Sequence, residues 1–302
     1  MSPVDFPRAG ANGRLSLAVP SKGRMAAPTL KLCADAGLSF EVTERALLVP
    51  CANAPVDLLL VRAHDIPEYV QDGVVHLGIT GANLVAEADA DVETLADLGY
   101  ARCTLEAGVP NDAPQMELAD LEGLRVATAY PVSTRARLGE LGVSVDVVTV
   151  SGSVEAAPGL GLSDAIVDLV STGSTARANG LRLIGRLLES QAVLVAGRAA
   201  EAKADLVAGL ELMLSGVVAA RRRRYLMMNA TEATLPAIRA VLPSMGAPSV
   251  LNLAAEGEIA VHAAVDADDV WTLLPALKRA GASSILVLPL PAGLPTLSGL
   301  LL

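Results

Sequence analysis

The sequence predicts an α/β body of two lobes followed by a C-terminal α+β domain of the ferredoxin-like type. Over residues 14–220, short apolar runs of strand length alternate with segments of helical periodicity, which is typical of parallel sheets covered by helices. After residue 224 the expected order becomes strand, helix, strand, strand, helix, strand, which is the order of a ferredoxin-like unit. The length of 302 residues allows about two or three domains.

The first lobe is expected to hold a parallel, doubly wound sheet. Residues 14–20 alternate as a strand does, and the continuous apolar run 57–61 is typical of a buried parallel strand. The further strands are expected at 74–79 and 191–196, and the helices at 28–38, 66–71 and 201–220.

The second lobe and the C-terminal domain follow from the same patterns. We place the first lobe at residues 14–103 plus 189–220, the second at 104–188, and the last domain at 225–302. In the second lobe we expect strands at 103–109, 123–129, 145–150 and 165–170, with a helix at 132–141. In the last domain we expect strands at 225–230, 249–253, 259–264 and 284–289, with helices at 235–241 and 270–279.

Composition limits the class of protein. With 52% hydrophobic but only 2% aromatic residues, the core must consist mainly of aliphatic side chains. A formal net charge of −10 argues against nucleic acid as a partner, because its phosphates require a broad basic surface. Every long apolar run is interrupted, the start lacks the apolar stretch of a signal peptide, and three scattered cysteines form no zinc or disulfide pattern. We therefore expect a soluble cytoplasmic protein with no membrane partner.

The segment after the expected strand 165–170 is the strongest functional signal. It contains Ser171, Thr172, Gly173, Ser174 and Thr175, and a helix follows. Unpaired N–H groups at a helix start, hydroxyl donors and a glycine that allows close approach are suited to binding a phosphate. The alternative is that these residues only cap the helix.

Acidic residues precede this segment. Asp164 and Asp168 lie in or just before the strand, and Glu155 lies shortly upstream. An acid beside a bound phosphate needs a different partner, such as sugar hydroxyls or a metal ion. A ribose phosphate would supply both the phosphate and the hydroxyls.

Cations follow two strands of the first lobe. Lys22 and Arg24 come after the first strand, and Arg62 comes after the strand 57–61. The carboxyl ends of strands in open α/β sheets are the usual place for ligands. Ordinary solvated surface charge remains the alternative interpretation for residues 22–24.

These motifs resemble the ATP phosphoribosyltransferase family, the first enzyme of histidine biosynthesis, in its long form with a C-terminal regulatory domain. The resemblance covers nearly the whole chain, with a two-lobed body like that of periplasmic binding proteins and an ACT-like last domain. Its motifs are VPSKGR at 19–24, DIPE at 65–68, GITG at 78–81, EAAP at 155–158, the segment 164–180 and GASSIL at 281–286.

The resemblance implies transfer of the phosphoribosyl group of phosphoribosyl pyrophosphate to N1 of ATP, with Mg²⁺ held mainly by substrate phosphates. It implies that residues 171–175 hold the 5-phosphate and that Asp168 binds the ribose hydroxyls, with Asp164 nearby. Lys22 and Arg24 would face the pyrophosphate or nucleotide phosphates.

Further implied contacts are those of Arg62 and Glu155 with the nucleotide. The resemblance also implies feedback inhibition by histidine, bound between subunits of a hexamer built from dimers, with Asn229, Ser283 and Ser284 as contacts. A purely oligomerising last domain is the alternative.

Two residues depart from the family pattern. Val167 stands where related enzymes often carry a second acid before Asp168, and His76 stands where an acid is usual. We expect His76 and His262 to be packed within strands and not to be catalytic. Rival functions are an anion-binding module built on the same two-lobed plan and a phosphoribosyltransferase with a different acceptor.

Overall fold

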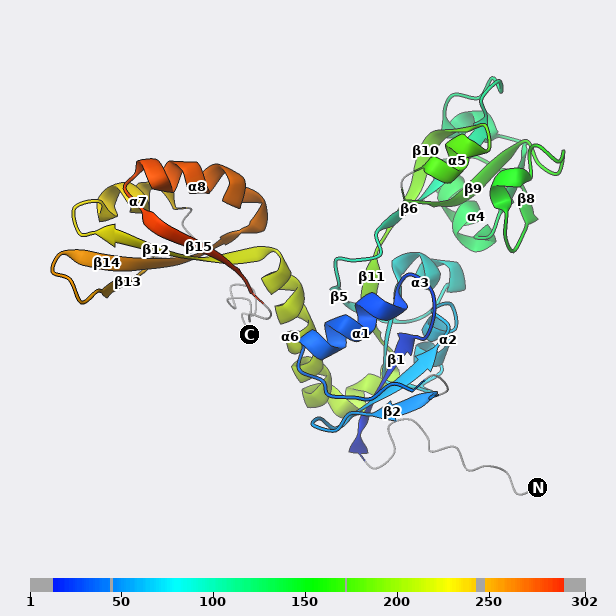
Figure 1. Ribbon diagram of the computed structural model, residues 1–302. Coiled ribbons are helices and arrows are strands. Elements are labelled where there is room, and N and C mark those ends of the chain that lie inside the picture. The colour runs from blue at the N-terminus through cyan, green and yellow to red at the C-terminus, as the bar shows by residue number, and fades with distance from the viewer. Residues whose placement is uncertain (1–12, 44–45, 172, 243–247, 291–302) are drawn as a thin grey trace. The chain divides into compact units, whose positions relative to one another are not determined.

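The computed structural model describes residues 13–43, 46–171, 173–242 and 248–290, and these residues form three β-sheets (Figure 1). They group into two compact units. The first unit holds the elements β1 to β11, and the second holds β12 to β15. The division falls within helix α6 (Ala204–Arg221), between Glu211 and Leu212.

The first sheet is built around β1, which pairs in parallel with β3 on one side and with β4 on the other. β1 and β11 are buried along their whole length, because helices cover both faces of central strands in such sheets. On one face, Ile66 and Val70 of α2 pack with Val193 and Val195 of β11. The strands in spatial order are β2 (Leu48–Pro50), β3 (Val56–Val61), β1 (Leu15–Pro20), β4 (Leu77–Gly81), β11 (Ala192–Ala196) and β5 (Glu93–Asp97). The helices of this lobe include α1 (Ala26–Asp35), α2 (Ile66–Gln71), α3 (Ala82–Ala88) and the 3-10 helix η4 (Arg198–Lys203).

The second sheet has β6 near its centre, antiparallel to both of its neighbours β10 and β9. β7 pairs in parallel with β9 and β8. The strands in spatial order are β10 (Leu181–Ser190), β6 (Cys103–Pro110), β9 (Ala165–Val170), β7 (Arg125–Thr128) and β8 (Asp146–Thr149), with α4 (Pro131–Glu140), α5 (Ser174–Ala178) and the 3-10 helices η2 (Leu118–Leu121) and η3 (Val154–Ala156).

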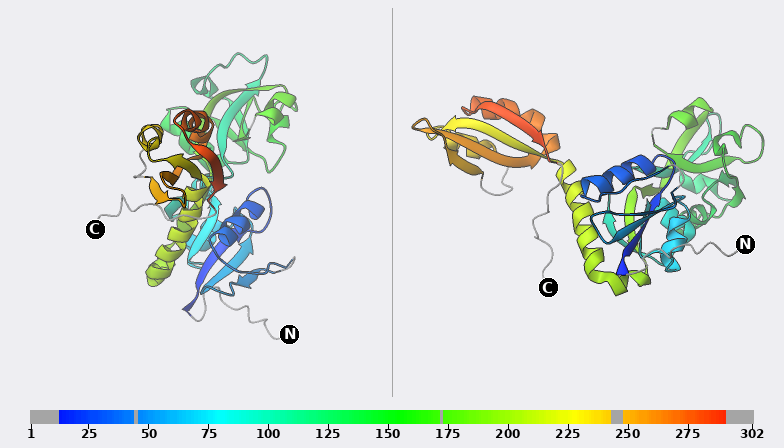
Figure 2. Two further views of the ribbon diagram at one scale, coloured as in Figure 1. Left: turned by 60° about the vertical axis from the view of Figure 1, so that its left-hand side comes forward. Right: turned by 60° about the horizontal axis from the view of Figure 1, so that its bottom comes forward.

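The chain passes between these two sheets along paired strands. β5 of the first sheet leads into β6 of the second, and β10 leads back into β11. β6 and β10 are hydrogen-bonded to each other, so both crossings lie side by side (Figures 1 and 2). The first unit is therefore a body of two α/β lobes.

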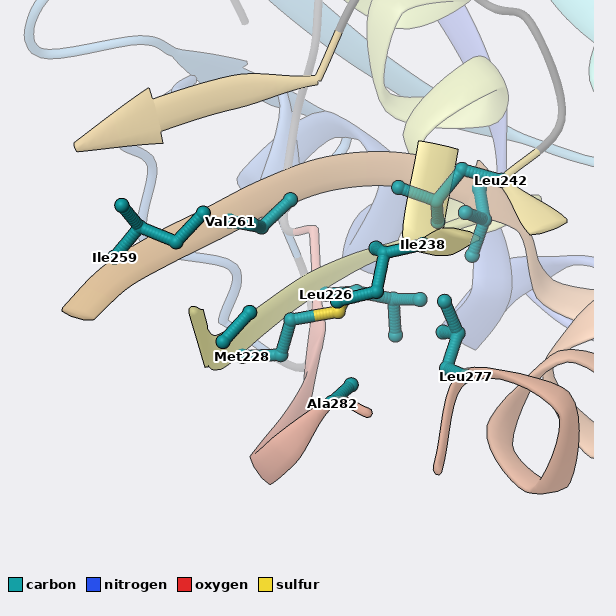
Figure 3. Packing of buried hydrophobic residues seen from close by; sticks show 10 residues of the cluster. Leu226, Met228, Ile238, Leu242, Ile259, Val261, Leu277 and Ala282 are labelled. Carbon is teal, nitrogen blue, oxygen red and sulfur yellow. The ribbon is translucent and has the colours of Figure 1, made fainter. Parts of the chain in front are cut away.

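The second unit is a ferredoxin-like α+β domain. Its antiparallel sheet has the order β13 (Ser249–Asn252), β14 (Glu258–Asp266), β12 (Arg223–Thr231) and β15 (Ser283–Pro289), with α7 (Leu235–Val241), α8 (Val270–Arg279) and the 3-10 helix η5 (Ala267–Asp269). Figure 3 shows its core, in which Leu226 and Val261 of the sheet meet Ile238 of α7 and Leu277 of α8.

The fold class predicted from the sequence is confirmed, and most expected strands appear within a few residues of their predicted ends. β2, β5, β10 and α3 were not predicted. β10 carries Arg182, Arg186 and Glu189 among its aliphatic residues, so its alternation is obscured. β4 begins at Leu77 and not at residue 74.

The prediction that His76 lies within a strand is wrong, since the residue directly precedes β4. Its ring Nδ1 lies 2.6 Å from Ser16 Oγ and accepts the Ser16 N–H at 3.1 Å. Burial, with a smaller contribution from Lys203, lowers the pKa of His76. The lowered pKa favours a neutral ring, which is hydrogen-bonded to Ser16. His262 does lie within β14, as predicted.

The cysteines are buried and free. Burial, with a smaller effect of Cys51, raises the pKa of the Cys33 thiol to about 12. They therefore act as small apolar core residues. Within the described ranges, no helix combines the length and the apolar character needed to cross a membrane.

Helix α4 offers a matched test of the core of the second lobe. Leu138 is 0% exposed, whereas Leu141, at the end of the same helix, is 59% exposed. We expect Leu138→Ala to lower the free energy of unfolding by about 2–5 kcal/mol, because it removes buried contacts and leaves a cavity. Leu141→Ala should change it by about 0.5 kcal/mol or less. Urea unfolding of both variants checks this, and equal effects would contradict the packing described.

Candidate functional site

The segment that follows β9, residues 171–175, is named here the phosphate loop. Gly173 has a φ of 70°, in the left-handed region that favours glycine. A Cβ at this position would also lie 2.9 Å from a guanidinium nitrogen of Arg177. The loop conformation therefore depends on glycine at 173. Thr172 lies outside the described residues.

A cavity of about 140 Å³ brings the loop together with two of the predicted acids. Its lining includes Ser171, Gly173 and Thr175 of the loop, Asp168 of β9 and Glu155 of η3. Ser174 also lines this cavity. Residues with hydroxyl groups and residues with carboxylates thus line one space, and a sugar phosphate binds to both kinds of group.

Asp168 is the most perturbed acid of this cavity. Burial raises its pKa, and the nearby Glu155 raises it further, while a hydrogen bond from Leu169 N–H at 2.8 Å acts in the opposite direction. The site therefore disfavours the carboxylate when it has no ligand. Hydroxyl donors or a cation at this position would relieve that cost.

The structure does not bring Asp164 into this group. Its carboxylate accepts the N–H of Arg125 at 2.9 Å, at the start of β7. Asp164 precedes β9 while Asp168 lies near the end of that strand. Four residues of extended strand span about 13 Å, which separates the two carboxylates.

The basic loop, residues 21–24, reaches the phosphate loop through Arg24. The Arg24 guanidinium donates to Ser171 Oγ at 3.1 Å. Ser21 N–H donates a hydrogen bond to Val61 O at 2.7 Å. The basic loop and Arg62 therefore both follow the carboxyl ends of the parallel strands β1 and β3. Lys22 and Arg62 are exposed there, and among the described residues neither lines the cavity beside the loop.

Tyr130 belongs to the same region but was missed from the sequence. Burial raises the pKa of its hydroxyl, and Asp168, Cys103 and Glu87 raise it further, while Arg24 lowers it. Tyr130 follows the end of β7. Lys22, Arg24 and Arg62 were identified because they follow parallel strands. The same criterion would also have identified Tyr130.

A second and larger cavity, of about 800 Å³, adjoins the phosphate loop. Ser171 and Gly173 line both cavities, and the larger one also has Arg102, Arg177 and Arg186 in its wall. Asp97, Glu106 and Glu189 also line this cavity, so its wall carries charges of both signs. The arginines were not predicted, although Arg177 lies within the segment 164–180.

The predicted regulatory residues lie together in the C-terminal domain. Asn229 of β12 pairs with Ser283 of β15, and Ser283 Oγ donates to Asn229 O at 3.3 Å. Ser283 and Ser284 line a cavity of about 490 Å³ together with Lys278. Ser284 has a φ of 49°, which is uncommon for a residue other than glycine.

Protein ligands for a metal ion are few at the candidate site. In the part of the chain that the structure describes, no group of three or more His, Cys, Asp or Glu side chains could hold an ion. Asp168, Glu155 and Glu106 are the carboxylates that line the smaller cavity with the phosphate loop. One or two carboxylates fit a magnesium ion that keeps phosphate or water as its other ligands.

Comparison with known proteins identifies relatives over almost the entire chain. The ATP phosphoribosyltransferase family model matches residues 62–216, and the HisG C-terminal domain model matches residues 220–292. The ATP phosphoribosyltransferase of Methanosarcina acetivorans is 40% identical over 288 residues, covering 93% of this chain and 100% of the relative. That of Maricaulis maris is 42% identical over 286 residues, covering 92% and 97%.

A solved structure shares the fold. The ATP phosphoribosyl transferase (HisG:HisZ) complex from Thermotoga maritima aligns with a TM-score of 0.56 at 24% identity. The alignment covers 67% of this chain and 98% of that one.

The raised pKa of Asp168 predicts a stability cost at neutral pH. A carboxyl whose pKa is raised by folding contributes stability that is full below its ordinary pKa and is lost as the pH rises through the folded value. We expect Asp168→Asn to unfold at a higher temperature than the wild type at pH 7, with the difference shrinking as the pH falls toward 4, about the ordinary pKa of a carboxyl.

Thermal unfolding between pH 4 and pH 8 measures this difference. Asp146→Asn is the matched control, because the Asp146 side chain is 70% exposed on β8 of the same sheet. An Asp168→Asn variant less stable than the wild type at pH 7 would contradict the burial cost.

Proposed function

This chain belongs to the ATP phosphoribosyltransferase family, and from that premise we propose that it transfers the phosphoribosyl group of phosphoribosyl pyrophosphate to N1 of ATP, releasing pyrophosphate. Family membership assigns the chain to the first step of histidine biosynthesis. The observation that carries the proposed chemistry is the small cavity in which the phosphate loop meets Asp168 and Glu155.

The phosphate loop is proposed to bind the 5-phosphate of phosphoribosyl pyrophosphate. The left-handed turn at Gly173 lets backbone approach a ligand closely, and the Ser171 and Thr175 side chains line the same space. Backbone N–H groups and hydroxyls are the usual neutral donors to phosphate. The bound phosphate would fix the position of the ribose ring relative to β9.

Asp168 is proposed to bind the ribose hydroxyls. It lies two residues before the end of β9, close to the loop, and lines the cavity. As the bond to pyrophosphate breaks, positive charge grows on the ribose ring, and a nearby carboxylate stabilises it. Glu155, in the same cavity, is proposed to face the nucleotide side.

Cations at the mouth of the site are proposed to hold the phosphates of the two substrates. Arg24 already contacts the loop through Ser171, and Lys22 and Arg62 are exposed at the same sheet edge. Arg102 and Arg177, in the wall of the larger cavity, are proposed to contact the polyphosphate of one substrate. Holding both anionic substrates in line supplies orientation without a covalent nucleophile.

Magnesium is proposed as the cofactor. When bound, it neutralises charge on the leaving pyrophosphate. Asp168 and Glu155 can supply the protein oxygens, and substrate phosphates would complete the coordination.

The C-terminal domain is proposed to bind histidine as a feedback inhibitor, in an oligomer from dimer to hexamer. Asn229, Ser283 and Ser284 are the proposed polar contacts, since they lie on neighbouring strands and two of them line one cavity. A cytoplasmic location is proposed because the reaction consumes ATP. The three buried free thiols also suit a reducing compartment.

The reaction is tested by incubating the full chain with ATP, phosphoribosyl pyrophosphate and Mg²⁺, with and without histidine. We expect the ultraviolet absorbance of N1-ribosylated adenine to rise and histidine to suppress it. Product that histidine does not affect would retain the transferase and reject the proposed inhibition. Tight binding of the substrates without product would instead indicate a binding module.

Gly173→Ala tests the phosphate loop. The φ of 70° at position 173 disfavours any side chain, and the added Cβ would lie 2.9 Å from a guanidinium nitrogen of Arg177. We expect kcat/KM for phosphoribosyl pyrophosphate to fall at least about a hundredfold, a loss of roughly 3 kcal/mol of transition-state stabilisation. Gly142→Ala is the control, because Gly142 has a φ of 74° but lies away from the loop, at the end of α4. Equal activity of the two variants would remove Gly173 from the site.

A further inference from the structure

A row of charged side chains crosses three strands beside the phosphate loop. Glu106 of β6 stands directly opposite Asp168 of β9 on one side and opposite Arg186 of β10 on the other. Directly opposite residues of antiparallel strands project from the same face of the sheet. Asp168 and Glu106 accordingly both line the small cavity that contains the loop.

The Glu106 carboxylate is mostly buried and has capacity to accept further hydrogen bonds. Its side chain is 15% exposed. Thr104 Oγ1 donates to Glu106 Oε1 at 2.6 Å, whereas Arg186 Nε lies 3.8 Å from that oxygen, too far for a hydrogen bond. Among the described residues, Thr104 is therefore the hydrogen-bond donor to this carboxylate, which can accept about four such bonds.

Two carboxylates facing each other across a strand pair repel, so this arrangement costs stability unless something lies between or beside them. Arg186 offsets part of the charge, but it also pairs with Glu189. The remaining acceptor capacity of Glu106 points into a cavity that already holds a phosphate loop. Neighbouring hydroxyl groups of a sugar are donors that suit such a pair of acids.

The residue next to Asp168 in the chain cannot supply a second acid on this face. Val167 is 0% exposed and packs in the core on the opposite face, together with Leu105 and Ala107. Successive residues of a strand alternate between faces, so a second carboxylate beside Asp168 must come from another element, as Glu106 of β6 and Glu155 of η3 do.

We propose that Glu106 is a substrate-binding residue, which shares the ribose hydroxyls of the sugar phosphate with Asp168. Thr104 and Arg186 are its positioning residues. This role rests on the proposed function, because it takes the ligand of the phosphate loop to be a ribose phosphate.

The test is calorimetric binding of ribose 5-phosphate and of inorganic phosphate to the full-length chain, comparing the wild type with Glu106→Gln. We expect the variant to bind ribose 5-phosphate about tenfold or more weakly, since a hydrogen bond to a charged group is lost. Binding of inorganic phosphate should change less than about twofold, because the loop itself is untouched. Glu140→Gln, an exposed acid of α4 paired with Arg137, is the control and should match the wild type.

Thr104→Val provides a second variant that keeps the strand and removes the hydroxyl holding Glu106. It should weaken ribose 5-phosphate binding in the same direction while sparing phosphate. The role of Glu106 would be overturned, and the proposed function retained, by either of two results. In one, Glu106→Gln binds ribose 5-phosphate as tightly as the wild type does; in the other, it loses equal affinity for ribose 5-phosphate and for phosphate. If the wild type binds ribose 5-phosphate no more tightly than inorganic phosphate, both the proposed function and the role of Glu106 are wrong.

Discussion

The pairing of β6 on both of its edges is the constraint on which the candidate site depends. One ladder joins β6 to β9 and thereby places the phosphate loop, because the loop begins where β9 ends. The other ladder joins β6 to β10, and these two strands carry the chain between the lobes. A single strand thus fixes the loop, the acids beside it and the connection to the lobe that carries Arg24.

The site is assembled from groups that oppose folding when they have no ligand. Burial and Glu155 raise the pKa of Asp168, and the structure places Glu106 across the ladder from the same residue. These unfavourable charges are tolerated because aliphatic clusters pack beneath them, on the other face of the same sheet. Hydroxyl donors that bind these carboxylates would offset part of this cost.

Local sequence patterns were sufficient for most of the fold. Apolar runs such as β3 and β9 are continuous, and the helices of the last domain have a clear periodicity, so their positions follow from residue type alone. β10 was missed because its charged residues break the alternation, and its register contains two irregularities. Its place in the sheet comes from pairing with β6, a partner about eighty residues away in sequence, which no local pattern records.

For the candidate site, the sequence by itself predicted a phosphate site at residues 171–175 and an acid near the end of the preceding strand. A glycine among hydroxyl residues, between an apolar strand and a helix start, is typical of a phosphate site. The family resemblance was confirmed by relatives along almost the whole chain. Only the tertiary structure decided which charged groups share the cavity. It separated Asp164 from Asp168 along one strand, and it placed Glu106 opposite Asp168 and Arg186 opposite Glu106, because strand register, and not distance in sequence, sets which side chains meet.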